Sequence, residues 1–438
     1  MSNTETPTPS LGEAAARVLE RLEPANREFT ARFGGDRPDR QPVHTVYGGA
    51  QLYKAETTTK LGELALRALD QHAPDAQTFA EAVGMAGDAA LAAKVYGRVR
   101  AKLEREPVED FRIDFEDGYG TRTDAEEDRE AARTAGEVVE AMGRGQLPPF
   151  IGIRIKSLTE ENKARAARTL DIFVSTLVAK LGAPRLPDNF VVTVPKVSIP
   201  EQVSAVVELC ELLEDHTGLA RGALALELMV ETTQSMVDAH GRATLPRLLD
   251  AARGRCTGAH FGTYDYTASA SVTAAYQVMD HPACDMARNM MMWAYAGTGV
   301  FLSDGATNVM PVGDTETVHA AWRLAYGHTR HSLETGFYQG WDLHPAQLPV
   351  RYAACYAFFL EGFEQAAERL SNFIAKAAQA TLVGEVFDDA ATGQGLLNYF
   401  LRARNCGAIT DAELAQTGLS VEEIQLRSFA KILAGRRG

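Results

Sequence analysis

Eight short runs rich in β-forming residues recur along the chain, and this repeat restricts the possible folds more than any other feature. Segments with apolar residues at helical spacing separate the runs, so strand and helix alternate. The runs cover residues 42–47, 111–116, 149–155, 189–197, 223–231, 257–265, 298–304 and 335–345. Such alternation predicts parallel βαβ units.

The spacing of the runs predicts a closed barrel. From the second run to the eighth, the polar residues that end each run follow one another at intervals of 34 to 42 residues. Only the first interval is long, 70 residues from Tyr47 to Asp117, so we expect extra helices there. Eight strands at this pitch fit a (β/α)8 barrel, the TIM barrel. A doubly wound open sheet is the alternative, but it more often carries GxGxxG or GxxxxGK[ST], and neither motif is present.

Helical segments flank the predicted barrel on both sides. A helix is expected over residues 11–33, and the 90 residues after the last run have helical spacing. We therefore predict an α/β chain of three parts. These are an N-terminal helical extension (1–40), a TIM barrel catalytic domain (41–348) and a C-terminal helical cap domain (349–438).

Composition excludes several classes of partner. The chain has 44 basic and 58 acidic residues, a net charge of −14, which argues against binding to nucleic acid or to an anionic membrane surface. No apolar run approaches the ~18 residues that span a bilayer, and the N-terminus has no secretory pattern. The five cysteines are scattered and odd in number, which is typical of reduced thiols. We expect a cytoplasmic protein.

Acidic residues stand where consecutive runs end. Glu231 and Asp265 end the fifth and sixth runs, and Glu116 and Asp117 end the second. In a parallel barrel these ends lie on one rim. Oxygen ligands of this kind favour Mg²⁺, with Mn²⁺ as the alternative. A second interpretation is that the acids are solvated rim charges or ion pairs with basic neighbours.

Three further rim residues could bind a substrate. Arg154 ends the third run, and a planar guanidinium suits a two-pronged grip on a carboxylate or an enolate oxygen. Its other interpretation is a salt bridge to Asp117. Lys196 could form a Schiff base, although an electrostatic role is the simpler reading. His344 ends the eighth run, where a site role and a packing role are both open.

Seven segments, in order, resemble motifs of the citrate lyase β-subunit-like family, the HpcH/HpaI aldolase superfamily, which includes relatives of malate synthase and malyl-CoA lyase. The first resembles the DLEDAV motif of that family, and the fourth its IET motif. The segments are DFEDGY (114–119), GIRIKSL (152–158), VTVPKV (192–197), LELMVET (226–232), GTYDYTAS (262–269), GFYQGWDLHPAQ (336–347) and VFDDAA (386–391).

This resemblance implies a Mg²⁺-dependent enzyme on a TIM barrel and assigns roles by position. Glu231 and Asp265 match the metal-binding acids. Arg154 matches the arginine that holds the oxo group of glyoxylate, oxaloacetate or a similar partner. Asp117 matches an acid beside the metal. The family also implies oligomers of trimeric type.

The resemblance places the catalytic base in the C-terminal part. Asp388 or Asp389 matches an aspartate that acts as the base in the malate synthase and malyl-CoA lyase relatives. The alternative is that both aspartates cap the helix that follows. The chain departs from the family pattern at Lys156, where an asparagine is usual, and at Gly118–Tyr119, which replace Ala-Val.

Together these observations predict a Mg²⁺-dependent carbon–carbon lyase or synthase of aldol or Claisen type. The expected substrate is a small 2-oxo or 3-hydroxy acid, as the free acid or as a CoA thioester. The expected assembly is a homo-oligomer, a trimer or a hexamer. The alternatives are a metal-dependent pyruvate aldolase that does not use CoA, and a non-catalytic barrel that only binds.

Overall fold

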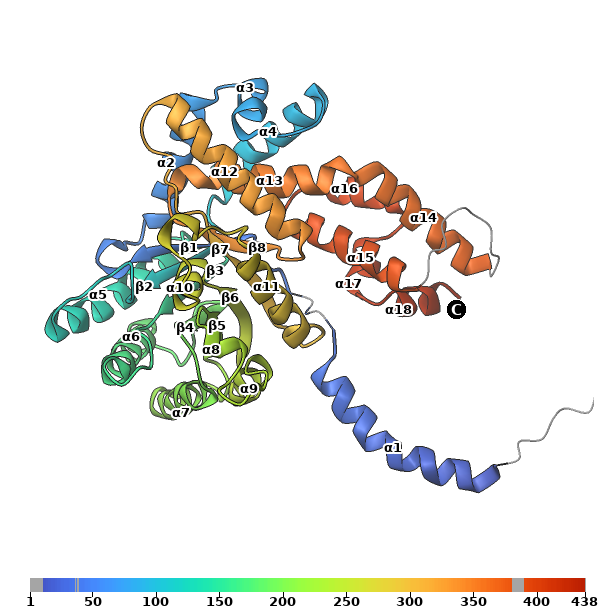
Figure 1. Cartoon of the computed structure of the whole chain (residues 1–438), viewed down its shortest axis with the longest axis horizontal. Helices are drawn as coiled ribbons and strands as arrows, with labels where there is room; N and C mark the ends of the chain where they lie inside the picture. Colours follow the sequence, from blue (N-terminus) through green and yellow to red (C-terminus); the bar gives the residue numbers. More distant parts are fainter. Residues whose placement is uncertain (1–10, 36, 38, 380–389, 438) are drawn as a thin grey trace, which may run out of the picture.

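The computed structural model describes residues 11–35, 37, 39–379 and 390–437. Its centre is a closed barrel of eight parallel strands in chain order, with β8 pairing to β1 (Figure 1). The prediction of a TIM barrel is confirmed, and every predicted run overlaps a strand. The strands are β1 (His44–Gly49), β2 (Asp110–Asp114), β3 (Phe150–Arg154), β4 (Phe190–Val194), β5 (Ala225–Val230), β6 (Cys256–Phe261), β7 (Phe301–Ala306) and β8 (Gln339–Asp342).

Helices connect the strands and surround the barrel. Three of them lie between β1 and β2, as the long first interval predicted: α2 (Thr57–His72), α3 (Ala76–Val83) and α4 (Ala89–Arg105). The other connecting helices are α5 (Asp124–Gly143), α6 (Lys163–Leu181), α7 (Pro200–Thr217), α8 (Thr233–Met236), α9 (Leu245–Ala251), α10 (Thr263–Ser269), α11 (Pro282–Tyr295) and α12 (Thr315–Glu334). Short 3-10 helices are η1 (Ala50–Leu52), η2 (Ala274–Tyr276), η3 (Pro345–Gln347) and η4 (Ala415–Thr417).

Local sequence explains why these elements form where they do. All five residues of β4 are buried, as a valine-rich central strand of a parallel sheet requires. Helix α7 begins with Pro200, whose fixed φ suits the first turn and whose missing N–H needs no partner there. It ends at Gly218, which adopts φ 76°, a conformation that suits glycine.

Helices also precede and follow the barrel. The first is α1 (Gly12–Arg32), and the last are α13 (Leu348–Glu361), α14 (Phe363–Gln379), α15 (Ala390–Asn405), α16 (Asp411–Leu414), α17 (Val421–Gln425) and α18 (Phe429–Arg437). Helix α13 is buried on nearly all sides, packed against α12 and α4. The later helices extend from it beside the barrel (Figure 1). Within the described ranges, no helix combines the length and apolar character needed to cross a membrane. The division into 1–40, 41–348 and 349–438 stands as a proposal.

Candidate active site

Charged side chains from neighbouring strands meet at the rim formed by the carboxyl ends of the strands, where TIM barrels carry their active sites. Each lies at or just after the end of one of the strands β2 to β6. These residues are Asp114, Arg154, Lys196, Glu231 and Asp265. Four of the five were predicted from the sequence.

Arg154 is buried and fixed in orientation. Its Nε donates to Oδ1 of Asp114 at 2.7 Å, and its Nη2 donates to Oδ2 of the same carboxylate at 2.5 Å. Its Nη1 lies 3.3 Å from Oε2 of Glu116. Burial alone would lower the pKa of Arg154. The negative charge of Asp114 and its hydrogen bonds have the larger effect and raise this pKa. Arg154 is therefore a permanent cation with a fixed plane, and a guanidinium has five N–H donors.

Lys196 links the acids of the rim. It adopts φ 52°, and its backbone N–H donates to Oε1 of Glu231 at 2.7 Å. Its Nζ donates to Glu116 and, at 3.2 Å, to Asp117, and lies 3.7 Å from Oδ2 of Asp265. Burial alone would lower its pKa, but the hydrogen bond and charge of Glu116, with other acids, raise it. An amine that stays charged is a poor Schiff-base nucleophile, so the geometry favours the electrostatic role.

Glu231 and Asp265 form an unequal pair of carboxyl groups. Glu231 is 1% exposed, whereas the side chain of Asp265 is 44% exposed. Burial, together with the negative charge of Asp265, raises the pKa of Glu231 to about 8. Without a further cation, Glu231 therefore holds a proton at neutral pH. A divalent cation between the two groups would favour the ionised form.

The donor set at the rim fits a hard cation. Its carboxylates outnumber its cationic side chains, Arg154 and Lys196. The part of the chain that the structure describes holds no cluster of three or more His, Cys, Asp or Glu arranged to bind a metal. Mg²⁺ usually takes only one or two carboxylates and completes its shell with water and substrate. Glu231 and Asp265 are the pair that suits this mode.

Two glycines leave room for carboxyl groups of the rim. A Cβ at Gly262 would lie 2.5 Å from Oε2 of Glu231. A Cβ at Gly118 would lie 2.6 Å from Oδ2 of Asp114, the oxygen that accepts a hydrogen bond from the N–H of Gly118 at 2.7 Å. This contact accounts for glycine at position 118, where the family that the sequence resembles has alanine.

We predict that Gly118→Ala lowers activity without unfolding the protein. The added methyl group would displace the carboxylate of Asp114, and Arg154 would lose its fixed plane. Misplacement of such a group by about 1 Å costs roughly a hundredfold in rate. Turnover and melting temperature should be measured together. Gly143→Ala is the matched control, because a Cβ there meets nothing within 4 Å; equal turnover in both variants would contradict the prediction.

The other predicted site residues lie at the edge of this cluster, away from it, or outside the described residues. The side chain of Asp117 is 60% exposed and accepts a hydrogen bond from the amine of Lys196 at 3.2 Å. His344 caps η3, and its Nδ1 accepts from the N–H of Ala346 at 3.2 Å. Burial lowers the pKa of His344, which favours the packing role. Asp388 and Asp389 lie outside the described residues.

Sequence reasoning missed three residues around Arg154. One is Asp114. The others are aromatic: the guanidinium of Arg154 lies 4.8 Å from the centre of the Tyr47 ring, which packs against Trp341 at 4.7 Å between ring centres. The hydroxyl of Tyr47 is buried without a hydrogen-bond partner in the described part of the chain. A signal for Asp114 was present, because charged residues alternate with apolar ones at 110, 112 and 114.

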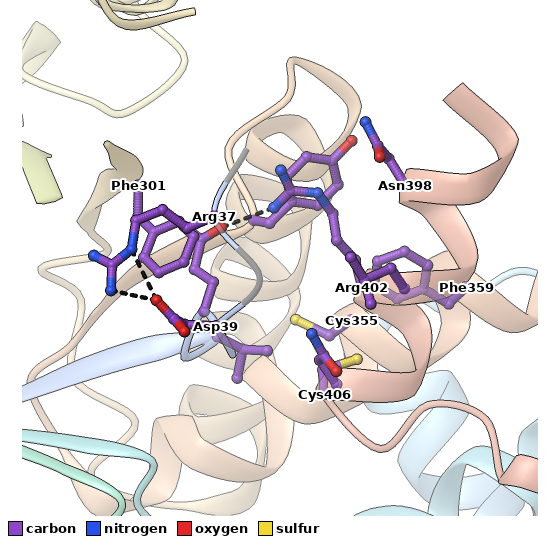
Figure 2. A pocket seen from close by; sticks show the side chains of 13 residues that line it. Arg37, Asp39, Phe301, Cys355, Phe359, Asn398, Arg402 and Cys406 are labelled. Atoms are coloured by element: carbon purple, nitrogen blue, oxygen red, sulfur yellow. Dashed lines mark hydrogen bonds and ion pairs between the residues drawn. The ribbon is translucent and has the colours of Figure 1, made fainter. Parts of the chain in front are cut away.

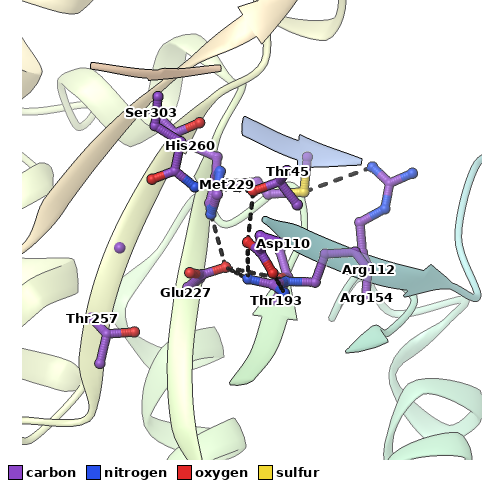
Figure 3. A network of polar contacts seen from close by, with 12 residues as sticks. Thr45, Asp110, Arg112, Arg154, Thr193, Glu227, Met229, Thr257, His260 and Ser303 are labelled. Carbon is purple, nitrogen blue, oxygen red and sulfur yellow. Dashed lines mark hydrogen bonds and ion pairs between the residues drawn. The ribbon is translucent and has the colours of Figure 1, made fainter. Parts of the chain in front are cut away.

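A buried ionic network fills the barrel beneath this rim (Figure 3). Arg112 donates to Oδ1 of Asp110 at 2.5 Å, to Oε2 of Glu227 at 2.6 Å and to Oγ1 of Thr193 at 2.8 Å. His260 Nε2 lies 2.8 Å from the same Glu227 oxygen. Barrel interiors are usually apolar layers, so here charged groups replace part of the core.

The neighbours of His260 fix its tautomer. Trp341 Nε1 donates to Nδ1 of His260 at 3.2 Å, so Nε2 carries the proton and donates to Glu227. Trp341 also packs on Tyr47. The interior network is thereby connected to the aromatic pair below Arg154.

A separate pocket lies at the opposite end of the barrel, between the segment before β1 and helices α13 and α15 (Figure 2). Its volume of about 40 Å³ is far below the ~300 Å³ of ordinary ligand pockets. Cys355 and Cys406 line it, and burial raises the pKa of both thiols. All five cysteines are free, and all except the half-buried Cys256 are buried.

Comparison with a solved citrate lyase confirms, for the fold, the resemblance that the motifs predicted. A citrate lyase from Burkholderia xenovorans shares 18% identity with a TM-score of 0.59, over 87% of this chain and 98% of that chain. A malate synthase from Haloferax volcanii shares 14% identity with a TM-score of 0.47, over 90% and 98%. A citrate lyase β subunit from M. tuberculosis, complexed with oxaloacetate and magnesium, shares 15% identity with a TM-score of 0.39, over 72% and 97%.

No curated protein matches this chain. A family model does, over residues 22–432, a span that includes the whole barrel and every described rim residue. The chain therefore belongs to the family described as "Domain of unknown function (DUF6986)".

Proposed function

We propose that this chain is a Mg²⁺-dependent carbon–carbon lyase or synthase of aldol or Claisen type. Its substrate would be a small 2-oxo or 3-hydroxy acid, free or as a CoA thioester, and Mn²⁺ would be the alternative metal. The observation that carries the proposal is one rim with a carboxyl pair, Glu231 and Asp265, beside a buried and fixed guanidinium, Arg154. We also propose a cytoplasmic location, in keeping with the free thiols.

The residues of the rim suit the formation of an enolate. Making or breaking a carbon–carbon bond next to a carbonyl places negative charge on an oxygen, and fixed donors aimed at that oxygen lower the barrier. Arg154 would bind and orient the oxo acid through the N–H groups that Asp114 leaves free. Mg²⁺ bound by Glu231 and Asp265 would add positive charge that stabilises the developing oxyanion.

The proton must move through another group. Lys196 is held charged by its acidic neighbours, and Glu231 and Asp265 are assigned to the metal. We propose Asp388 or Asp389 as the general base, as in the relatives that the sequence resembles. We also propose that Lys196 and Asp117 bind the polar end of the substrate, with His344 at the margin of the site.

The assay that tests the proposal uses purified chain stripped of metal with a chelator. We expect turnover on return of Mg²⁺, either with acetyl-CoA and glyoxylate or in the cleavage of a 3-hydroxy acid or its CoA thioester. Release of pyruvate from 4-hydroxy-2-oxo acids without CoA would favour the aldolase alternative. If Mg²⁺ produces no heat in titration calorimetry and no substrate turns over, the protein is a binding barrel and the proposal fails.

We predict that Arg154→Lys is not a conservative change. Lysine keeps the charge but cannot hold Asp114 with two hydrogen bonds and present a planar donor to the substrate. Loss of one such donor costs roughly 3–4 kcal/mol of barrier, so kcat should fall about 10²–10³-fold and KM for the oxo acid should rise. Steady-state kinetics measure both values. Arg168→Lys, at an exposed surface pair with Asp128, is the control; wild-type kinetics in Arg154→Lys would assign Arg154 a structural role.

We predict that Asp388→Ala/Asp389→Ala is inactive, and that subunit mixing shows which chain supplies the base. Inactive Arg154→Ala chains mixed with the double aspartate variant should regain activity if the base acts across subunits, because some sites then hold both groups. Activity is read before and after subunit exchange. If the double variant is active, neither Asp388 nor Asp389 is the general base. An inactive one that mixing never rescues would place the base within its own chain.

A further inference from the structure

Helix α1 stands apart from the rest of the protein (Figure 1). None of its 21 residues is buried. In the described part of the chain, the hydrogen bonds and ion pairs that tie it to the body lie at its C-terminal end and just after it: Arg32 pairs with Asp250 at 2.6 Å, and the N–H of Gly35 donates to the carbonyl of Gly297 at 2.9 Å. The helix is therefore held at one end and exposed along its length.

The exposed helix carries a continuous apolar stripe. Leu11, Ala15, Val18, Leu22, Ala25 and Phe29 follow one another at alternating intervals of four and three residues. This 3.5-residue repeat is the pattern by which one helix packs against another. Leu11, Val18, Leu22 and Phe29 are each between 49% and 70% exposed. Within the residues that the structure describes, the stripe is not packed against its own body.

A helix of this kind needs a partner. Most of the stability of a helix in a protein comes from packing of its apolar face rather than from helix propensity. Pro24 lies inside α1 and removes one backbone hydrogen bond. The stripe must therefore be covered if the helix is to persist in solution.

The charges of α1 indicate which partner fits. The helix has four glutamates and four arginines, a net charge of zero, while the whole chain carries −14. Bodies with this charge repel one another, but neutral helices that extend from them do not. Glu13, Arg17, Glu20, Arg21 and Glu28 make no ion pair within the described part of the chain.

When two copies of α1 pack antiparallel, opposite charges on the two helices come together. If the stripes of two copies face each other with Leu22 opposite Ala25, Phe29 lies opposite Val18. Arg21 of each helix then flanks Glu28 of the other, and the two-fold axis forms this pair twice. The same arrangement puts the two bodies at opposite ends of the helix pair.

We propose that α1 is an oligomerisation helix that packs antiparallel against α1 of a second copy of this chain. A two-fold contact of this kind makes a dimer from single barrels, and joins two trimers into a hexamer if the barrels themselves form trimers. In either case the contact doubles the mass of the assembly.

The test is the mass of the full-length protein by sedimentation equilibrium from 1 to 100 µM. We expect Leu22→Glu to have half the mass of the wild type across this range. Ala16→Glu is the matched control: it puts the same charge on the same helix, at an exposed position off the stripe, and should keep the wild-type mass. Equal masses for wild type and Leu22→Glu at every concentration would overturn the proposal.

Charge exchange tests the antiparallel register. Arg21→Glu and Glu28→Arg, each alone, should weaken the association roughly tenfold, because both cross-helix pairs become like-charged. The double variant Arg21→Glu/Glu28→Arg restores opposite charges across the antiparallel pair, and its dissociation constant should return to within about threefold of the wild type. If the single variants have no effect, or the double variant is weaker than either single one, the antiparallel contact is wrong.

Discussion

Glu231→Gln is expected to abolish Mg²⁺-dependent turnover while the fold is retained. Glutamine has the shape of glutamate and can still accept the hydrogen bond from the backbone N–H of Lys196, seen at 2.7 Å. It cannot supply the negative charge that a hard cation requires. Loss of the positive charge at the developing oxyanion should lower kcat by roughly 10³-fold or more. Asp265→Asn should behave alike, because Mg²⁺ would lose one of only two protein carboxylates.

The melting temperature, measured with and without Mg²⁺, separates loss of the metal from loss of the fold. Mg²⁺ should raise the melting temperature of the wild type and leave that of Glu231→Gln unchanged, because a ligand stabilises only the state that binds it. Glu160→Gln is the control for the same substitution at an exposed position. Full activity of Glu231→Gln in the presence of a chelator would remove the metal from the mechanism.

Much of the barrel could be predicted because its signals are local and repeated. Strands buried on both faces need apolar runs, and parallel connections need helices, so the alternation in the sequence predicted eight strands. Boundaries were less accurate where glycines flank a strand. The run at 298–304 corresponds to β7 at Phe301–Ala306, and the run at 335–345 to the much shorter β8 at Gln339–Asp342.

The residues of the rim could be predicted from the sequence only as well as the ends of the strands could be located. Because every parallel strand ends on the same rim, residues that follow the runs had to lie close together, and the structure brings Arg154, Lys196, Glu231 and Asp265 into one cluster. Which acid would pair with Arg154 depended on where β2 ends. Asp117 was one candidate partner from the sequence, but β2 ends at Asp114, whose carboxylate holds Arg154.

The interior of the barrel could not be predicted from apolar patterning. Side chains two residues apart on a strand share a face, so Asp110, Arg112 and Asp114 lie on one face of β2. Their partners come from distant strands, as with Glu227 on β5, 115 residues from Arg112. Charge compensation over such separations has no local signal in the sequence.

This network leads to the largest effect on stability that we expect. Arg112→Met should lower the free energy of unfolding by roughly 3–5 kcal/mol, the usual cost of removing one partner from a buried ionic group. Arg112 is 1% exposed and lies between Asp110 and Glu227. Burial acts on Glu227 to raise its pKa, but the charge of Arg112, with the hydrogen bond from His260, outweighs this and lowers it. Without Arg112, two buried carboxylates face each other without their shared cation.

A variant in which the whole network is neutral tests whether unpaired charge causes the loss of stability. Replacing all members of a buried ionic network by groups of similar shape is often nearly neutral, because no charge is left unpaired. Asp110→Asn/Arg112→Met/Glu227→Gln should therefore recover most of the stability that Arg112→Met loses. Urea denaturation of both variants measures the difference, and Arg168→Met, at an exposed pair, should lower stability far less than Arg112→Met. If Arg112→Met were as stable as Arg168→Met, the carboxylates would be protonated in the native barrel and Arg112 would contribute packing alone.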